Sequence, residues 1–352
     1  PSYLGSSFAF IAVVVAATGY SGQGPNPSLD IALGGIIAAG VLYGIIALIV
    51  MRSGVGWVAR LMPPVVTGAV VAAIGLNLAP IAVKSVSGSQ FDTWIALVTV
   101  LIIGLIAVAA PGIWRRLPII IGAIGGYLLY VLLANGLGLE KPIDFTALTA
   151  APWIGLPKFT GPSFHADAMF LIAPVAIILV AENLGHIKAI GVMTGRSLDS
   201  FLGRAFLGDS LATIVSGFGG GTGVTTYAEN IGVMAATKVY STLLFVVAAI
   251  VSILLGFSPK FGALILSIPG PVIGGLSIVL FGLIAAMAGR IWVENKVDFS
   301  DPRNLITVAA ALTAGAGDLT IKLGGFTMGG IGTATFGAVI LYKILAWNSA
   351  KQ

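Results

Sequence analysis

The stretch Gly219-Gly-Gly-Thr-Gly-Val-Thr-Thr-Tyr-Ala-Glu-Asn-Ile-Gly-Val-Met-Ala-Ala-Thr-Lys238 decides the fold. Five glycines lie within residues 217–223, a density that argues against a straight helix there. The β-branched and aromatic run Val224-Thr-Thr-Tyr227 favours extended backbone, and helix-forming residues resume at Ile231. Extended backbone at membrane depth is tolerated only beside protein or a cavity, so we interpret the stretch as a broken span at a binding site. A surface loop that carries one carboxylate, Glu229, is the alternative.

The composition of the 352-residue chain places this stretch in a membrane protein. Hydrophobic residues make up 57%, charged residues 9%, and the mean hydropathy is +1.05. A soluble domain carries about a quarter charged residues. The 48 glycines suit close helix packing in lipid, and the lack of cysteine excludes disulfides and thiol chemistry. We therefore expect an all-α polytopic membrane protein.

Twelve apolar stretches approach the length that crosses a bilayer, about 20 residues. They lie near residues 6–22, 29–51, 58–82, 94–110, 117–136, 167–190, 203–218, 223–237, 239–257, 262–289, 303–317 and 328–347. One long polar insertion, residues 135–167, holds four prolines. We interpret this insertion as an extramembrane loop that links two halves of the chain.

The positive net charge of +5 has a topological explanation. Alternate loops hold 13 of the 18 basic residues, namely Arg52, Arg60, Arg115, Arg116, Lys188, Arg196, Arg204, Lys238, Arg290, Lys296, Arg303, Lys343 and Lys351. Basic loops face the cytoplasm, so these loops and the C-terminus are expected on that side. The charge then gives no reason to expect a nucleic-acid partner.

An internal repeat is visible in two short matches. Met62-Pro-Pro-Val-Val-Thr-Gly-Ala-Val-Val aligns with Ile268-Pro-Gly-Pro-Val-Ile-Gly-Gly-Leu-Ser, and Ser6-Ser-Phe-Ala-Phe10 aligns with Thr225-Thr-Tyr-Ala-Glu229. Two expected spans separate the polar loop from the second copy of the latter motif, and none precedes the first copy. We therefore expect about two further spans upstream; seven spans per copy, an odd number, would give the copies opposite orientations. The chain opens without Met, as that expectation requires.

Few acidic side chains fall inside the expected spans. Glu182 and Glu229 do, whereas Asp209 lies near the charged end of its span and Asp318 closes another. A carboxylate inside the membrane is costly, which makes Glu182 and Glu229 functional candidates. His186 falls one turn after Glu182 on the same helix face. We weigh it equally as a proton-handling group and as a buried histidine satisfied by the backbone.

The sequence offers little to an enzyme or to a metal site. The chain has two histidines and no cysteine, whereas zinc takes three or four protein ligands. The Gly219–Gly223 run has no Gly-Lys-Ser/Thr after it, so it is not a phosphate-binding loop. We expect no catalytic residue, no metal and no cofactor.

The expected site has a distinct chemical inventory. Two carboxylates accept hydrogen bonds, and the N–H groups of two extended segments donate them. No Arg or Lys is expected at the same depth, so an anionic ligand would lack a counter-charge. A small, planar, neutral molecule with ring N–H donors and carbonyl acceptors fits, with Phe8 and Tyr227 as apolar surfaces. Nucleobases match this description, which is not unique to them.

Three motifs, in order, resemble the nucleobase–ascorbate transporter family (nucleobase:cation symporter-2), and its bacterial uracil permeases in particular. Glu229-Asn-Ile-Gly-Val-Met-Ala-Ala-Thr-Lys238 is similar to the family signature. Ala181-Glu-Asn-Leu-Gly-His186 and Tyr3-Leu-Gly-Ser-Ser-Phe-Ala-Phe10 resemble two further segments. The resemblance implies two inverted repeats of seven spans, core and gate domains, and substrate held between short antiparallel strands in the third and tenth spans. It places the start of this chain in the third span.

The resemblance also implies roles for individual residues. Substrate binding falls on Glu182, Glu229, Phe8, Ala228, Tyr227 and Ser7, and proton coupling falls on Glu182 and His186. Ala228 stands where uracil permeases carry glycine, and a contact through its backbone N–H would survive that change. An acid at the first signature position, Glu229, resembles the pyrimidine branch, because purine carriers more often show Gln there.

The expected domains are residues 1–54 and 151–257 for the core, and residues 55–150 and 258–352 for the gate. The expected function is uptake of uracil or a related pyrimidine across the bacterial cytoplasmic (inner) membrane, driven by the proton gradient. A purine (xanthine or uric acid) permease is the alternative, followed by an anion exchanger or channel of the same architecture. The expected partners are the neutral nucleobase and the lipid bilayer, and a homodimer is left open.

Overall fold

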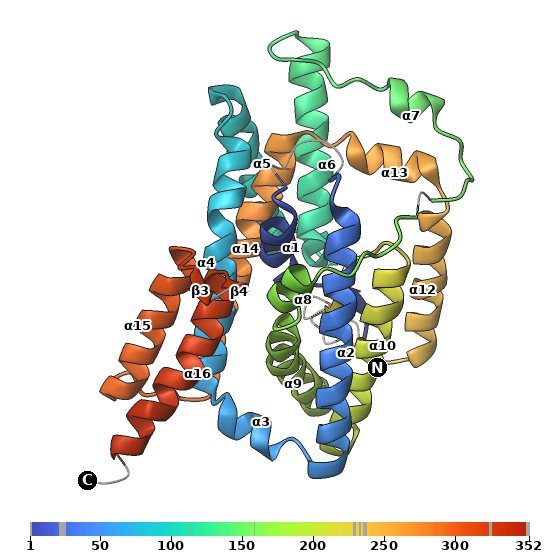
Figure 1. Ribbon diagram of the computed structural model, residues 1–352. Helices are drawn as coiled ribbons and strands as arrows, with labels where there is room; N and C mark the ends of the chain where they lie inside the picture. The colour runs from blue at the N-terminus through green and yellow to red at the C-terminus, as the bar shows by residue number, and fades with distance from the viewer. Residues whose placement is uncertain are drawn as a thin grey trace. The chain divides into compact units, whose positions relative to one another are not determined.

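The computed structural model describes residues 2–20, 26–112, 114–157, 159–227, 230, 231, 234, 238–323 and 326–349. Figure 1 shows a mostly helical chain. The elements before the long polar loop are β1 (Leu4–Ser6), α1 (Ala9–Thr18), α2 (Leu29–Ser53), α3 (Gly56–Leu61), α4 (Pro64–Val86), α5 (Gln90–Ala109), η1 (Trp114–Arg116), α6 (Pro118–Tyr130) and the π-helical turn η2 (Val131–Gly136).

The remaining elements begin inside the polar loop. They are α7 (Thr146–Ala150), α8 (Ala166–Ile172), α9 (Val175–Thr194), η3 (Asp199–Phe201), α10 (Leu202–Phe218), β2 (Val224–Thr226), α12 (Thr242–Gly256), α13 (Pro259–Leu266), α14 (Gly270–Glu294), α15 (Pro302–Ala316), β3 (Ile321–Leu323), β4 (Phe326–Met328) and α16 (Gly330–Ser349). The hairpin of β3 and β4 is an element that the sequence did not lead us to expect.

Among the described residues, seven helices are long and apolar enough to cross a membrane, and the bent pair α12–α13 makes an eighth if it is one span. These helices match eight of the twelve expected stretches. The other four, residues 6–22, 203–218, 223–237 and 303–317, fall on shorter helices and strands or partly outside the described residues. The chain is thus a helical membrane protein with short strands.

Two of the spans predicted from the sequence are each divided into two helices in the structure. Residues 58–82 and 262–289 each contain two helices, α3 with α4 and α13 with α14. A proline stands at each break, Pro63 before α4 and Pro269 before α14. Proline lacks an N–H and disfavours helical backbone in the residue before it, so it ends one helix and tolerates the start of the next. The helices α4 and α14 begin 206 residues apart, the spacing of the repeat seen in the sequence.

The chain falls into two compact units. The first comprises Pro1–Asn77, Phe159–Phe245 and Ile284–Gln352, and the second comprises Leu78–Lys158 and Val246–Leu283. The division of the repeats into core and gate domains remains a prediction.

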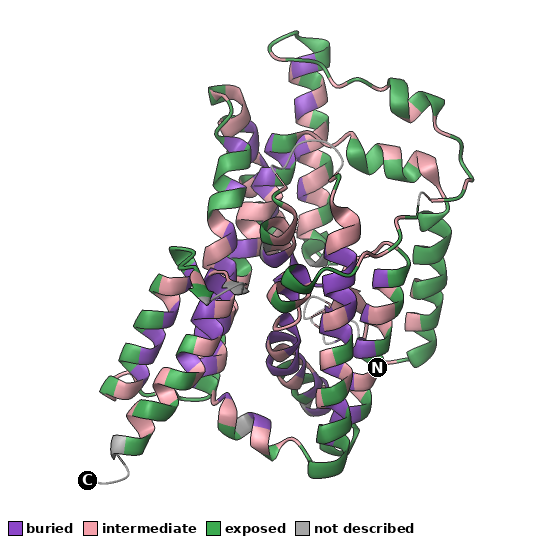
Figure 2. Ribbon diagram, in the orientation of Figure 1, coloured by how far each residue is buried: buried purple, intermediate pink, exposed green. Residues whose placement is uncertain are grey.

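The first unit is built around α2 and α10, which lie side by side in Figure 1. Glycine brings their backbones together: a Cβ on Gly40 would lie 3.2 Å from Ile214 N, and one on Gly203 would lie 2.9 Å from Met51 N. Small residues let helices approach closely enough for van der Waals packing in lipid, where no hydrophobic force drives them together. Figure 2 shows buried residues along α2, which contacts α8 and α9 as well as α10.

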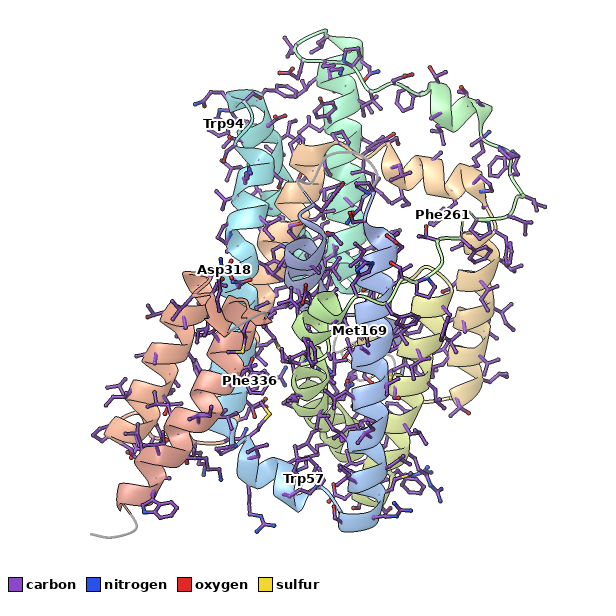
Figure 3. The ribbon with its side chains drawn as sticks, in the orientation of Figure 1. Trp57, Trp94, Met169, Phe261, Asp318 and Phe336 are labelled. Atoms are coloured by element: carbon purple, nitrogen blue, oxygen red, sulfur yellow. The ribbon has the colours of Figure 1, made fainter. Side chains whose placement is uncertain are left out.

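A second junction in the first unit lies where α15 ends and α16 begins. Asp318 adopts a φ of 47°, and its carboxylate accepts hydrogen bonds from Gly330 N (2.8 Å) and from Asn77 Nδ2 (3.2 Å). Figure 3 labels Asp318 at this junction. A carboxylate at a helix N-terminus satisfies a free N–H group and complements the helix dipole. Asp318 therefore holds the first residue of α16 in place. It follows the end of α15, in agreement with its expected position at the end of a span.

The second unit packs α5, α6 and the beginning of α14 together. Ile95, Tyr130, Ala134 and Val272 form its buried cluster. The Tyr130 hydroxyl donates a hydrogen bond to Lys141 O over 3.1 Å, which holds the start of the polar loop against α6. The polar insertion is therefore attached to the unit at its first turn.

Substitution of Gly203 by Ala is expected to separate α10 from α2, because the new Cβ would meet the backbone of Met51. Overpacking of this kind costs about 1–3 kcal/mol. The measurement is the thermal unfolding midpoint of the detergent-solubilised protein. Gly208→Ala is the matched control on the same helix, since nothing lies within 4 Å of a Cβ there. Equal midpoints for the two variants would contradict the close α2–α10 approach.

Candidate functional site

Two strands from distant parts of the chain meet at the candidate site. The strands β1 and β2 are antiparallel, with Leu4 opposite Thr226 and Ser6 opposite Val224. Two flanking bonds extend the ladder, from Ser7 N to Gly223 O (2.9 Å) and from Tyr227 N to Tyr3 O (3.1 Å). The expectation of short antiparallel strands is thus confirmed, and their place in two broken spans stays a prediction.

Small residues on both strands make this pairing possible. A Cβ on Gly5 would overlap the ring of Tyr227, and one on Gly223 would overlap the ring of Phe10. The Tyr227 hydroxyl donates a hydrogen bond to Ser6 O over 2.7 Å and lies 3.0 Å from Ser6 Oγ. The ring of Tyr227, just after β2, therefore packs on Gly5 of β1, and the ring of Phe10 on α1 packs on Gly223, just before β2.

The strand β1 leads directly into the helix α1. After β1, Ser7 is buried and its Oγ accepts a hydrogen bond from Ala9 N (3.3 Å), while Phe8 caps α1 with helical backbone and a half-buried side chain. Phe10 N and Ile11 N donate to Ser7 O (3.3 Å) and Phe8 O (3.1 Å). After β2, Ile231 N donates to Tyr227 O (3.3 Å). The described backbone at both strand ends is thus fixed by hydrogen bonds within the protein.

Asn183 on α9 holds β2 in place. Its Oδ1 accepts hydrogen bonds from Thr225 Oγ1 (3.0 Å) and Thr226 N (3.1 Å). Its Nδ2 donates to Tyr43 OH (2.8 Å) and to Asp209 Oδ2. The direction of the amide is fixed because the backbone N–H of Thr226 can only donate. One fully buried side chain therefore ties β2 to α2, α9 and α10.

The other polar residues of α9 lie close by in sequence. His186 hydrogen-bonds to the backbone of Thr226, and its Nδ1 is buried with no hydrogen-bond partner among the residues that the structure describes. Glu182 is half-buried one turn earlier on the same helix. The ring of His186 is thus buried and bonded to the backbone, and its role in proton coupling stays a prediction.

The structure brings five of the seven expected site residues to the strand pair or to α9 beside it. They are Ser7, Phe8, Tyr227, Glu182 and His186. The other two, Ala228 and Glu229, lie outside the described residues. The roles assigned to all seven remain predictions.

Three residues of the buried network were missed by the sequence analysis. Asn183 appeared only as part of a motif, and Tyr43 gave no signal because an isolated tyrosine in an apolar span has no pattern. Asp209 was given little weight because it lies near the charged end of its span, yet it is only 3% exposed. An acid within an apolar run was the signal that identifies it.

The polar groups beside the strand pair are hydroxyls, the amide of Asn183, the imidazole of His186 and the carboxylates of Glu182 and Asp209. They lie in a chain whose long apolar helices are those of a membrane protein.

The chain belongs to the xanthine/uracil permease family: the sequence model of the Permease family matches residues 1–324. It is therefore a transporter and not an enzyme. It is 64% identical over 346 residues to "Putative pyrimidine permease RutG" of Escherichia coli (strain K12), covering 98% of this chain and 78% of that protein. It is 39% identical to the "Uracil permease" of Paenibacillus larvae subsp. larvae over 97% of this chain and 81% of that protein.

Among solved structures, the fold is similar to the transmembrane domain of the cyanobacterial bicarbonate transporter BicA. The TM-score is 0.64 at 16% identity, over 97% of this chain and 83% of that chain. At this identity the likeness concerns the fold alone. It shows that the helices and short strands follow an architecture used by other membrane transporters.

Replacing Asn183 by Ala is expected to loosen β2, because Thr226 N and Asp209 lose their partner in a buried site. Leaving buried polar groups unpaired costs about 1–3 kcal/mol each. Hydrogen–deuterium exchange of the peptide that spans residues 222–227 measures the effect, and uptake of deuterium should be faster than in the unaltered protein. Asn295→Ala, whose amide bonds only within an exposed turn, is the control. If both variants exchange at the same rate, Asn183 does not hold the strand.

Proposed function

We propose that this protein takes up uracil or a related pyrimidine across the bacterial cytoplasmic membrane by proton symport. The observation that carries the proposal is the antiparallel pair β1–β2, in which β2 is hydrogen-bonded to Asn183 and His186 of α9, the helix that also carries Glu182. The names of the two relatives support a pyrimidine, and so does the acid at position 229.

In this proposal the substrate lies at the ends of the two strands. Glu182 and Glu229 accept the ring N–H groups, and backbone N–H groups around Phe8 and Ala228 donate to the ring carbonyls. Ser7 and Tyr227 border the site. A neutral ring satisfied on both edges leaves few polar groups unpaired, which a buried site requires.

We further propose that the intact protein has two inverted repeats of seven spans, each with a core and a gate portion. The order of elements supports this. After β1 the chain forms α2, the short helix α3 and then α4, α5 and α6. After β2 it forms α12, the short helix α13 and then α14, α15 and α16. The distribution of basic loops supports a cytoplasmic C-terminus as part of this proposal. A homodimer remains open.

Two other functions are weighed against this one. A purine permease would have the same strand pair and would differ in the residues that bind the nucleobase ring. An anion exchanger is suggested only by the fold shared with a bicarbonate transporter, and fold does not determine function. The carboxylates of the proposed site would repel an anion, which is why we place this alternative last.

The test is uptake of labelled uracil by cells that express the protein from its complete gene and lack their own uracil carriers. We expect saturable uptake that excess unlabelled uracil abolishes and that excess xanthine, chloride or bicarbonate does not. Cells with the empty vector are the control. Competition by xanthine that equals competition by uracil would replace the proposal with a purine permease, and competition by bicarbonate would replace it with an anion carrier.

Proton coupling is tested at Glu182. An ionised carboxylate is costly in an apolar helix, so Glu182 is expected to gain and lose a proton during the cycle, with His186 one turn away as the relay. Glu182→Gln mimics the protonated form, so it should abolish accumulation driven by an imposed pH gradient while uracil exchange partly persists. Glu294→Gln, at an exposed carboxylate at the end of α14, is the matched control. Gradient-driven accumulation that survives in Glu182→Gln would move the role to His186 or Glu229.

A further inference from the structure

The second unit contains a sharp corner between α12 and α13. The two helices are bent by 83° at the short break between Gly256 and Pro259. The helix α12 is apolar and has no buried residue, as a lipid-facing span would have. If α12 crosses the bilayer, a bend near a right angle lays α13 along the membrane surface, where amphipathic helices bind.

The long polar loop is fastened to this corner. Gly155 N donates a hydrogen bond to Phe257 O over 2.9 Å, and Lys260 N donates one to Pro152 O over 3.0 Å. The ammonium group of Lys260 lies 5.2 Å from the ring centre of Trp153. These contacts fix both ends of the turn formed by residues 152–155. The turn is therefore held against the corner between α12 and α13.

The turn carries large apolar side chains that the described protein leaves uncovered. Trp153 is 75% exposed, Ile154 85% and Leu156 80%, and Leu266 at the end of α13 is 86% exposed. Figure 2 shows α7 and α13 without a buried residue, and Figure 3 labels Phe261 on the same helix. Large apolar side chains that are exposed so close together in the sequence, at residues 153, 154 and 156, indicate an interaction surface.

We propose that Trp153, Ile154 and Leu156 insert into the lipid bilayer at the level of the headgroups and anchor the polar loop to the membrane. Two features select lipid as the occupant. The patch is continuous, through the α12–α13 corner, with the lipid-facing span α12. Its chemistry is that of a membrane interface, where tryptophan places an apolar body in the acyl region and its N–H near water, and a lysine ammonium stays at the headgroups.

The anchor has a mechanical consequence. Residues 135–167 link the two halves of the chain, and a free loop of that length would let the halves move without constraint. A turn fixed at the membrane interface keeps residues 153–156 of the loop at constant depth in the bilayer. The loop would then limit how far the two halves separate during the proposed transport movement.

The experiment is tryptophan quenching in vesicles. The other five tryptophans, Trp57, Trp94, Trp114, Trp292 and Trp347, are replaced by Phe, so that Trp153 alone reports. In phosphatidylcholine brominated near the headgroup end of the acyl chains, we expect Trp153 to lose intensity, to emit at shorter wavelength than a tryptophan in water and to resist iodide. The control carries its single tryptophan at Lys141→Trp, an exposed loop position, and should be quenched by iodide and not by brominated lipid.

Two results would overturn the proposal. Iodide quenching of Trp153 equal to that of the control would show a loop in water. Protection from both quenchers that grows with protein density in the vesicle would show that a second copy of the chain covers the patch. If the five-fold substitution does not fold, the difference in quenching between the unaltered protein and Trp153→Phe gives the same reading.

Discussion

The structure depends on the hydrogen bonds between β1 and β2. Extended backbone inside a membrane cannot leave its N–H and C=O groups to water, so each strand needs a partner within the protein. The partner of each strand lies about 220 residues away in the chain, and the pairing therefore forces two distant segments to one place. The start of α1 lies at the same place, because β1 leads into it.

Asn183 makes this junction part of the helical bundle. Its two polar ends reach in opposite directions, toward the β2 backbone and toward Tyr43 and Asp209. A buried network of this kind rigidifies a core only when every member is paired. Through Asn183 the strand β2 is hydrogen-bonded to residues of α2, α9 and α10.

Part of this could be predicted from sequence because it depends on local chemistry. The glycines of residues 217–223 and the β-branched run after them indicated a broken span, and the alignment of Ser6–Phe10 with Thr225–Glu229 indicated its partner. Other parts depend on tertiary contacts that one sequence does not reveal. No sequence pattern predicts that Tyr43 lies beside Asp209. The helix breaks at Pro63 and Pro269 were also missed, because the residues on both sides of each break are apolar.

The account's central claim is that the strand pair is where the substrate binds, and the lack of cysteine in the chain allows a direct test. Ser6→Cys places one thiol on the exposed side of β1, and Ser53→Cys places one at the far end of α2 as a control. Uracil should slow modification by a maleimide at Ser6→Cys and leave Ser53→Cys unchanged. Equal modification rates at Ser6→Cys with and without saturating uracil, in a variant that still transports uracil, would contradict the claim.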